Sequence, residues 1–190
     1  EPTMSINGFA APVLPPNTSV LLPERNSLTI QIPFEVTPFA PATLQLTSAG
    51  AQSSPFSLPP VQPYEPYIFP TILNENRTFN SPRNLAPPGS VITFWATGLG
   101  NTIPAMATGG AAPQSPQPLA ATLTIPGLEI LYAGAAPGLS SGITQINARV
   151  LPTADAILSL DAEVRLGDFT RQARTRVSVY TREPFTVILR

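Results

Sequence analysis

The sequence predicts an all-β protein made of two β-sandwich domains, and three observations lead to that prediction. The 190 residues include 25 prolines and 12 glycines, without the strict period of collagen. Short apolar runs lie between these residues, and 43% of the chain is hydrophobic, which is enough to form a core. The expected strands recur about every 8–12 residues with proline or glycine between them, which is typical of a β-sandwich.

The composition excludes most catalytic chemistries. Cysteine and histidine are both absent, so the chain has no disulfides, thiol nucleophiles, Ser-His-Asp triads or HExxH zinc sites. We therefore expect no enzyme activity, no cofactor and no metal. The net charge of −1 gives no electrostatic reason to expect nucleic acid as a partner. No apolar run approaches the ~20 residues of a membrane helix, so membrane insertion is not expected.

The compartment is inferred from composition alone. All ten cationic residues are arginine, and proline, threonine and serine are abundant. This usage favours an extracellular or cell-surface location. Glu1 stands where an initiator methionine would be, so we expect a processed form or an excised piece.

The first third of the chain predicts short strands around tight turns. Asn7-Gly8, between apolar pieces, is a strong signal for a two-residue hairpin turn. Residues 28–32 and 42–47 alternate between apolar and polar, which predicts half-buried strands. The turn at 49–50 leads to a partner strand over 54–58. Leu44 and Leu46 are expected to face one core together with Phe56 and Leu58.

The proline-rich stretch 59–70 predicts an extended linker. Its aromatic residues leave open the alternative that it packs between the domains. The predicted boundaries are an incomplete domain over 1–62, a linker over 63–70, a complete domain over 71–181 and a separate strand over 182–190.

A strand over 90–97 organises the second domain. Its residues are β-branched, aromatic or small and apolar, and it holds Trp95, the only tryptophan. Prolines and a glycine precede it, and Gly98 and Gly100 end it. The long loop 101–117 is either a surface feature or an interaction site. The later strands are expected over 119–125, 128–132, 143–150, 157–166 and 170–180.

A weak internal repeat relates the two parts of the chain. Residues 6–14 correspond to 125–131, residues 28–33 to 143–150, and residues 43–58 to 162–179. The strand over 90–97 has no copy in the first part. The first domain is therefore expected to lack its opening strand.

The same residues carry a family resemblance. The motifs are Asn80-Ser-Pro, 86–100, Ala133-Gly-Ala-Ala-Pro-Gly138, Ile143-Thr-Gln-Ile-Asn147 and 30–36. They resemble an immunoglobulin-like domain repeated near the C-termini of many uncharacterised secreted acidobacterial proteins. The resemblance implies two tandem Ig-like β-sandwich domains and export. It implies no activity and no catalytic residues. The incomplete first domain and the extra tail depart from the family pattern.

The tail has the pattern of a surplus strand. Residues 185–189 alternate between two faces, and such an edge strand would aggregate if it were left exposed. One surplus strand and one vacancy suggest strand addition. The expected donor residues are Phe185, Thr186, Val187, Ile188 and Leu189. The expected acceptor groove consists of Ile6, Leu28, Ile30, Ile32, Leu44, Leu46 and Phe56.

The leading hypothesis is a structural, pilus-like subunit that polymerises head to tail, with itself as partner, into an extracellular filament or surface assembly. Alternatively, the tail closes in cis, on the first domain or within the second, or the chain is a fragment whose opening strand has been removed. The rival function is a secreted carbohydrate-binding or cell-adhesion module, with glycans as partners.

Two further residue sets have both a functional and a structural interpretation. Asp155, Asp161, Glu163 and Asp168 could form a calcium site or a carboxylate pair, but solvated strand faces and turns are favoured. Cross-strand ion pairs across the hairpin 162–179 would explain both these residues and the nearby arginines. The arginines are Arg165, Arg171, Arg174 and Arg176, which could also bind an anionic polysaccharide. Trp95, Tyr64, Tyr67 and Phe94 could form a sugar-stacking platform, although Trp95 is expected in the core.

Overall fold

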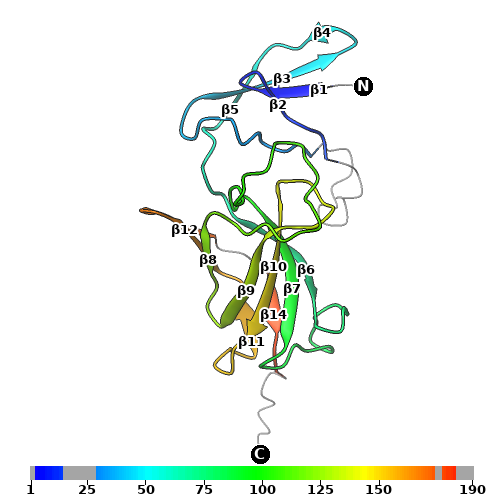
Figure 1. Ribbon diagram of the computed structural model, residues 1–190, viewed down its shortest axis with the longest axis vertical. Coiled ribbons are helices and arrows are strands. Elements are labelled where there is room, and N and C mark those ends of the chain that lie inside the picture. The colour runs from blue at the N-terminus through cyan, green and yellow to red at the C-terminus, as the bar shows by residue number, and fades with distance from the viewer. Residues whose placement is uncertain (1–2, 15–28, 174–176, 183–190) are drawn as a thin grey trace, which may run out of the picture.

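The structure, a computed structural model, describes residues 3–14, 29–173 and 177–182. Every regular element in these ranges is a β-strand, and the strands form several antiparallel sheets, as predicted. Figure 1 shows the strands in two units along the long axis of the molecule. The first unit lies at one end and comprises the described residues up to 62. The second unit comprises those from 63 onward.

One sheet forms the first unit. Its strands are β1 (Thr3–Ile6), β2 (Phe9–Ala10), β3 (Ala42–Ser48), β4 (Ala51–Gln52) and β5 (Phe56–Leu58). Their order is β2-β1-β3-β4, with β5 also paired to β3. Asn7 and Gly8 have φ angles of 51° and 82°, so the predicted hairpin turn is confirmed. Within the described residues this unit is a single layer, covered on part of one face by residues 29–39.

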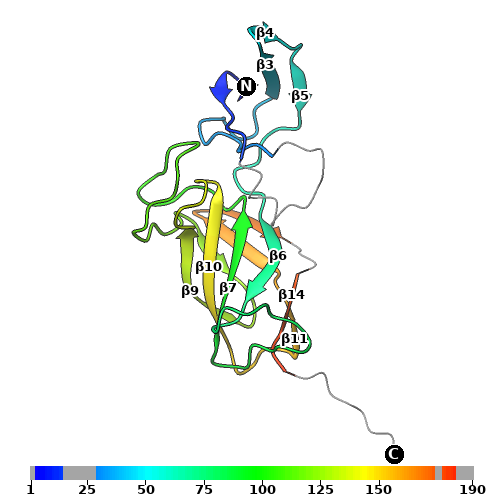
Figure 2. The same ribbon diagram turned by 90° about the vertical axis from the view of Figure 1, so that its right-hand side faces the viewer.

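The second unit has two layers. One is a four-stranded sheet in the order β6-β7-β10-β9, and the other combines the sheets β13-β12-β8 and β11-β14. The strands are β6 (Tyr67–Leu73), β7 (Val91–Thr97), β8 (Thr122–Thr124), β9 (Leu128–Ala135), β10 (Ile143–Val150), β11 (Ile157–Ser159), β12 (Ala162–Leu166), β13 (Phe169–Ala173) and β14 (Ser178–Tyr180). Figure 2 shows the second layer behind the four-stranded sheet.

The main core fills the space between these two layers. Phe94 and Ile146 project from the four-stranded sheet, and Val164 and Val179 project from the opposite layer. All four side chains are fully buried. This arrangement is that of a β-sandwich. Strands β7 and β10 match the predictions over 90–97 and 143–150, because their inner residues are apolar apart from Thr144.

Four strand predictions and the linker boundary need correction. Residues 29–32 make only a single bridge, between Ile30 and Val13, because Gln31 turns into the junction between the units. The linker predicted over 63–70 ends at Pro66, where β6 begins. This strand accommodates Pro70 because it lies at the sheet edge and its register shifts between Ile68 and Ile72.

The other three strand corrections concern the second layer. The strand predicted over 157–166 is interrupted at 160–161 and forms β11 and β12. The strand predicted over 170–180 contributes β13 and β14, which belong to two different sheets. The strand predicted over 119–125 is shortened to β8, and Leu119 makes only a bridge with Thr102. Short strands of this kind follow the twist of a small sandwich better than long straight ones.

Candidate functional site

One face of the first sheet is apolar and only partly covered. Directly opposed residues in an antiparallel ladder point to the same side of the sheet. Ile6 lies opposite Leu44, Met4 opposite Leu46, and Phe56 opposite Leu44. The apolar face therefore consists of Met4, Ile6, Ala42, Leu44, Leu46, Phe56 and Leu58.

The coverage of this face changes along the strands. Ile6 and Ala42 are buried against Val36, and Ile30 and Val61 pack against the same cluster. At the other end Leu46 is 37% exposed and Phe56 is 65% exposed. This side of the sheet ends at β5, whose outer edge has no backbone partner in the described part of the chain. The first unit thus presents an apolar surface next to an open strand edge.

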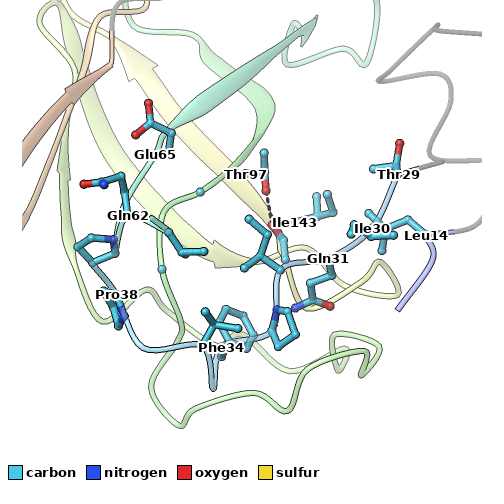
Figure 3. Close-up of a pocket in the computed structure, with 18 of the residues that line it drawn as sticks. Leu14, Thr29, Ile30, Gln31, Phe34, Pro38, Gln62, Glu65, Thr97 and Ile143 are labelled. Atoms are coloured by element: carbon cyan, nitrogen blue, oxygen red, sulfur yellow. Dashed lines mark hydrogen bonds between the residues drawn. The ribbon is translucent and has the colours of Figure 1, made fainter. Parts of the chain in front are cut away.

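A cavity of about 430 Å³ lies between the two units and adjoins this cluster. Ile30, Val36 and Val61 belong both to the cavity wall and to the core under the first sheet. Phe69 and Ile143 contribute the wall on the second unit. Figure 3 shows Phe34 and Pro38 from the first unit across the cavity from Thr97 and Ile143. The lining is mainly apolar, and the volume lies within the range of ligand pockets, about 300–1,000 Å³.

Gln31 fastens the two units together. Its side chain is 6% exposed. Its Nε2 donates to the Ser141 hydroxyl at 2.9 Å, and its Oε1 accepts from the Gly109 amide at 3.0 Å. The Ser140 hydroxyl also donates to this oxygen, at 3.3 Å. A buried amide with this many partners holds the segment 29–33 in one orientation on the second unit.

Further contacts extend the junction on either side of Gln31. The Thr108 hydroxyl donates to Glu35 at 2.7 Å and accepts from the Phe34 amide at 3.0 Å. On another side the Phe39 and Phe169 rings lie 6.2 Å apart. Tyr64 packs on Phe169, and burial raises the pKa of the Tyr64 hydroxyl. The loop predicted over 101–117 as a surface feature or interaction site thus takes part in an internal interface.

The structure places the predicted acceptor residues in three different settings. Ile6 is buried in the core of the first unit, where Ile30 and Leu44 pack against it. Leu46 and Phe56 lie on the exposed part of the apolar face. Ile32 is 48% exposed and lines the cavity. The remaining predicted residues lie outside the described part of the chain; they are Leu28, Phe185, Thr186, Val187, Ile188 and Leu189.

The alternative of a sugar-stacking platform made by Trp95, Tyr64, Tyr67 and Phe94 is wrong as a set. Phe94 and Tyr64 are buried in the main core, so neither ring can meet a ligand. Trp95 is not part of that core either, because its neighbours Phe94 and Ala96 point inward and Trp95 points outward. It lies half-buried against Phe69 and Ile143. Tyr67 shares this outer side and is half exposed.

The predicted pairing of acidic residues with arginines across the hairpin is also wrong for the described residues. Glu163 lies opposite Gln172 and accepts a hydrogen bond from the Gln172 Nε2 atom at 3.2 Å. Arg171 forms its ion pair with Glu65, at 2.6 Å, because its side chain reaches across to the segment before β6. The described residues contain no group of three acidic side chains able to hold a metal ion. Arg174 and Arg176 lie outside the described part of the chain.

The sequence analysis missed two residues with close tertiary contacts, Gln31 at the junction and Gly134 in β9. Gln31 occupies a polar position in an alternating pattern and gave no signal that it would be buried. By contrast, Gly134 within β9 carried a usable signal, since glycine in a strand marks a close backbone approach. A Cβ at Gly134 would lie 2.2 Å from the Gln117 carbonyl oxygen.

No family model, curated protein or solved structure matches this chain. In the part of the chain that the structure describes, no helix is long and apolar enough to cross a membrane.

Proposed function

We propose that the protein is a structural subunit that polymerises head to tail by strand addition. The donor is the tail, residues 182–190, and the acceptor is the first unit of a neighbouring molecule. The observation that carries the proposal is the apolar face of the first sheet, which ends in the open edge of β5 with Phe56 65% exposed beside it.

The edge of β5 suits an added strand. A strand laid beside β5 pairs its backbone with an edge that has no partner in the described residues. Alternate donor side chains, Phe185, Val187 and Leu189, then continue the apolar face next to Phe56. Full burial of each large apolar side chain contributes about 1.5–3 kcal/mol.

The position of the tail's origin favours docking on another molecule. Arg182 donates to the Pro152 carbonyl and, at 3.5 Å, to the Ala156 carbonyl, at the end of the second unit remote from the first sheet (Figure 1). The eight residues of β10 separate this end from the junction at Ser141, a distance of about 24 Å.

Residues 183–190 extend over at most about 26–29 Å. Residues 183–190 would need nearly all of this length to reach the junction, so they cannot also pair along β5 of the same chain. The same length readily reaches a first unit placed against the end of the second unit. The geometry therefore supports docking in trans over closure in cis on the first unit.

The wider proposal places this subunit outside the cell. The two units are tandem Ig-like domains, the first lacking its opening strand, and the filament or surface assembly is extracellular. The family resemblance and the composition support these statements. The described structure contributes the sandwich of the second unit and the single sheet of the first.

Light scattering and negative-stain microscopy on the full chain and on a 1–181 truncation test the proposal. Fibres or ladders that grow with concentration, from the full chain only, support strand addition in trans. Monodisperse monomers from both chains, with the truncation less stable, mean that the tail closes its own molecule and overturn the proposal.

A further inference from the structure

The outer face of the four-stranded sheet combines aromatic rings with amide groups. Trp95 points outward from β7, opposite Gln145 on β10, which in turn lies opposite Gly134 on β9. The neighbouring row holds Thr93, Asn147 and Tyr132. Figure 2 looks onto this face, and no described element crosses its middle.

Tyr132 is held on this face by its hydroxyl group. Its hydroxyl donates to the Ala135 carbonyl at 2.9 Å and lies 3.4 Å from the Gln117 carbonyl. A Cβ at Gly134 would come within 2.8 Å of the Tyr132 Cζ atom. The ring therefore runs along the strand, with its hydroxyl end over Gly134. An aromatic surface held in this way loses little conformational entropy when a ligand stacks on it.

The two amides between the rings present free polar atoms. Asn147 Oδ1 accepts from Thr93 Oγ1 and from Gln145 Nε2, each at 3.1 Å. These bonds fix both side chains. Gln145 Oε1 and Asn147 Nδ2 have no partner in the described part of the chain. The face thus offers one acceptor and one donor in fixed positions between two aromatic rings.

We propose that this outer face binds a neutral, linear, β-linked polysaccharide. The C–H faces of sugar rings stack on Trp95 and Tyr132, and sugar hydroxyls pair with Gln145 and Asn147. Trp95 and Tyr132 lie on strands β7 and β9, which are two strand spacings or about 9.6 Å apart, so a ligand that meets both rings must be extended across β10.

The charged side chains near this face balance each other, which favours a neutral ligand. The nearest charged side chains on the same face are Arg149 and Glu129, one row further along the strands. These two form an ion pair at 3.2 Å, so the charged residues of the four strands leave the face without net charge. This binding face is separate from β5, and its occupancy does not depend on assembly.

The test titrates the full chain with hexasaccharides of β-1,4-linked glucose and mannose. Calorimetry measures affinity, and Trp95 reports directly, because it is the only tryptophan. We expect a Kd in the micromolar to millimolar range for at least one sugar, with a shift in tryptophan emission. Absence of heat and of an emission change with both sugars overturns the proposal, as does tighter binding of an acidic hexasaccharide.

Variants locate the site. Gln145→Ala and Tyr132→Ala should each weaken binding about tenfold or more, while Trp95→Phe, which keeps a ring, should weaken it less. Phe79→Ala, which removes an exposed ring elsewhere, should leave the affinity unchanged. Unfolding temperatures measured alongside separate lost binding from lost folding. Unchanged affinity in folded Gln145→Ala and Tyr132→Ala proteins contradicts the proposal.

Discussion

Gly98, which directly follows β7, lies against the backbone of Glu65. Its φ angle is +73°, and a Cβ would lie 1.9 Å from the Glu65 carbonyl oxygen. The Glu65 amide donates to the Gly98 carbonyl at 2.9 Å, which holds the two backbones together. A side chain here requires both an unfavourable backbone conformation and a displacement of the segment that leads into β6.

We therefore expect Gly98→Ala to lower the free energy of unfolding by well over the ~1–2 kcal/mol of a positive φ alone. Gly89→Ala is the matched control, because Gly89 has a φ of +91° and open space around it. Urea unfolding of both variants checks the expectation. Equal losses would show that the close approach to Glu65 adds nothing.

Tyr64 gives the protein a specific alkaline sensitivity. Burial raises the pKa of its hydroxyl in the folded state. Its contribution to stability is therefore complete below the unfolded pKa of about 10 and is lost as pH rises through the folded pKa. We expect the free energy of unfolding to fall between pH 8 and a pH above about 10 in the parent chain. Tyr64→Phe should lose less of this free energy over the same pH range, and urea unfolding at both pH values measures the difference. The same alkaline loss in both chains would contradict this assignment.

The limits of prediction are clearest at single residues. Residues whose burial follows the strand alternation, such as Ile146, Ala148 and Val150 in β10, were predictable from the pattern alone. Gln31 was not, because its burial depends on three groups that lie far away in the sequence. Trp95 was expected inside because it is large and apolar, but the register of β7 gives the inner positions to its neighbours.

At the scale of elements, local signals predicted strands well and sheet partnership poorly. The Asn7-Gly8 hairpin and strands β3, β7 and β10 follow from turn chemistry and alternation. The segment 29–32 has the same alternation and forms no strand among the described residues, because a contact between units replaces strand pairing. The acceptor face was predictable only in part, since Leu46 and Phe56 depend on how much of the sheet is covered.

Phe56 on β5 should matter for assembly and not for folding. Its side chain is 65% exposed, so Phe56→Ala removes little buried area within one molecule. If a donor strand covers this ring, the same change weakens assembly by about 1.5–3 kcal/mol, or at least tenfold in affinity. Phe79→Ala removes a ring that is 68% exposed at the far end of the second unit and is the control. Sedimentation velocity of both variants measures the effect, and equal assembly would contradict the role of β5.

At the scale of the whole molecule, the junction holds the two units of one chain in a fixed orientation, and in the proposed polymer it would set how orientation passes from one subunit to the next. Gln31, Thr108 and the Phe39–Phe169 contact connect the units on different sides. A polymer of such subunits is stiff only if this junction is. The cavity between the units shows that the apolar packing there is incomplete, so the polar contacts carry much of the orientation.

We expect Gln31→Ala to loosen the junction and to cost about 1–3 kcal/mol, because it leaves the buried Ser141 hydroxyl and the Gly109 amide without their partner. Small-angle scattering should show a broader range of inter-unit orientations. The control is Gln114→Ala, at an exposed position of the loop 101–117, which contains Gly109. An unchanged scattering profile for Gln31→Ala would contradict the role of this contact.

Cross-linking tests the central claim, that the tail of one molecule docks beside β5 of another, most directly. The chain has no cysteine, so Ser57→Cys and Ile188→Cys introduced together provide the only thiols. After mild oxidation at low concentration, a non-reducing gel should show a ladder of covalent multimers that collapses on reduction. A single monomer band that runs faster than the reduced chain would mean that the tail pairs with its own β5, and the head-to-tail account would be wrong.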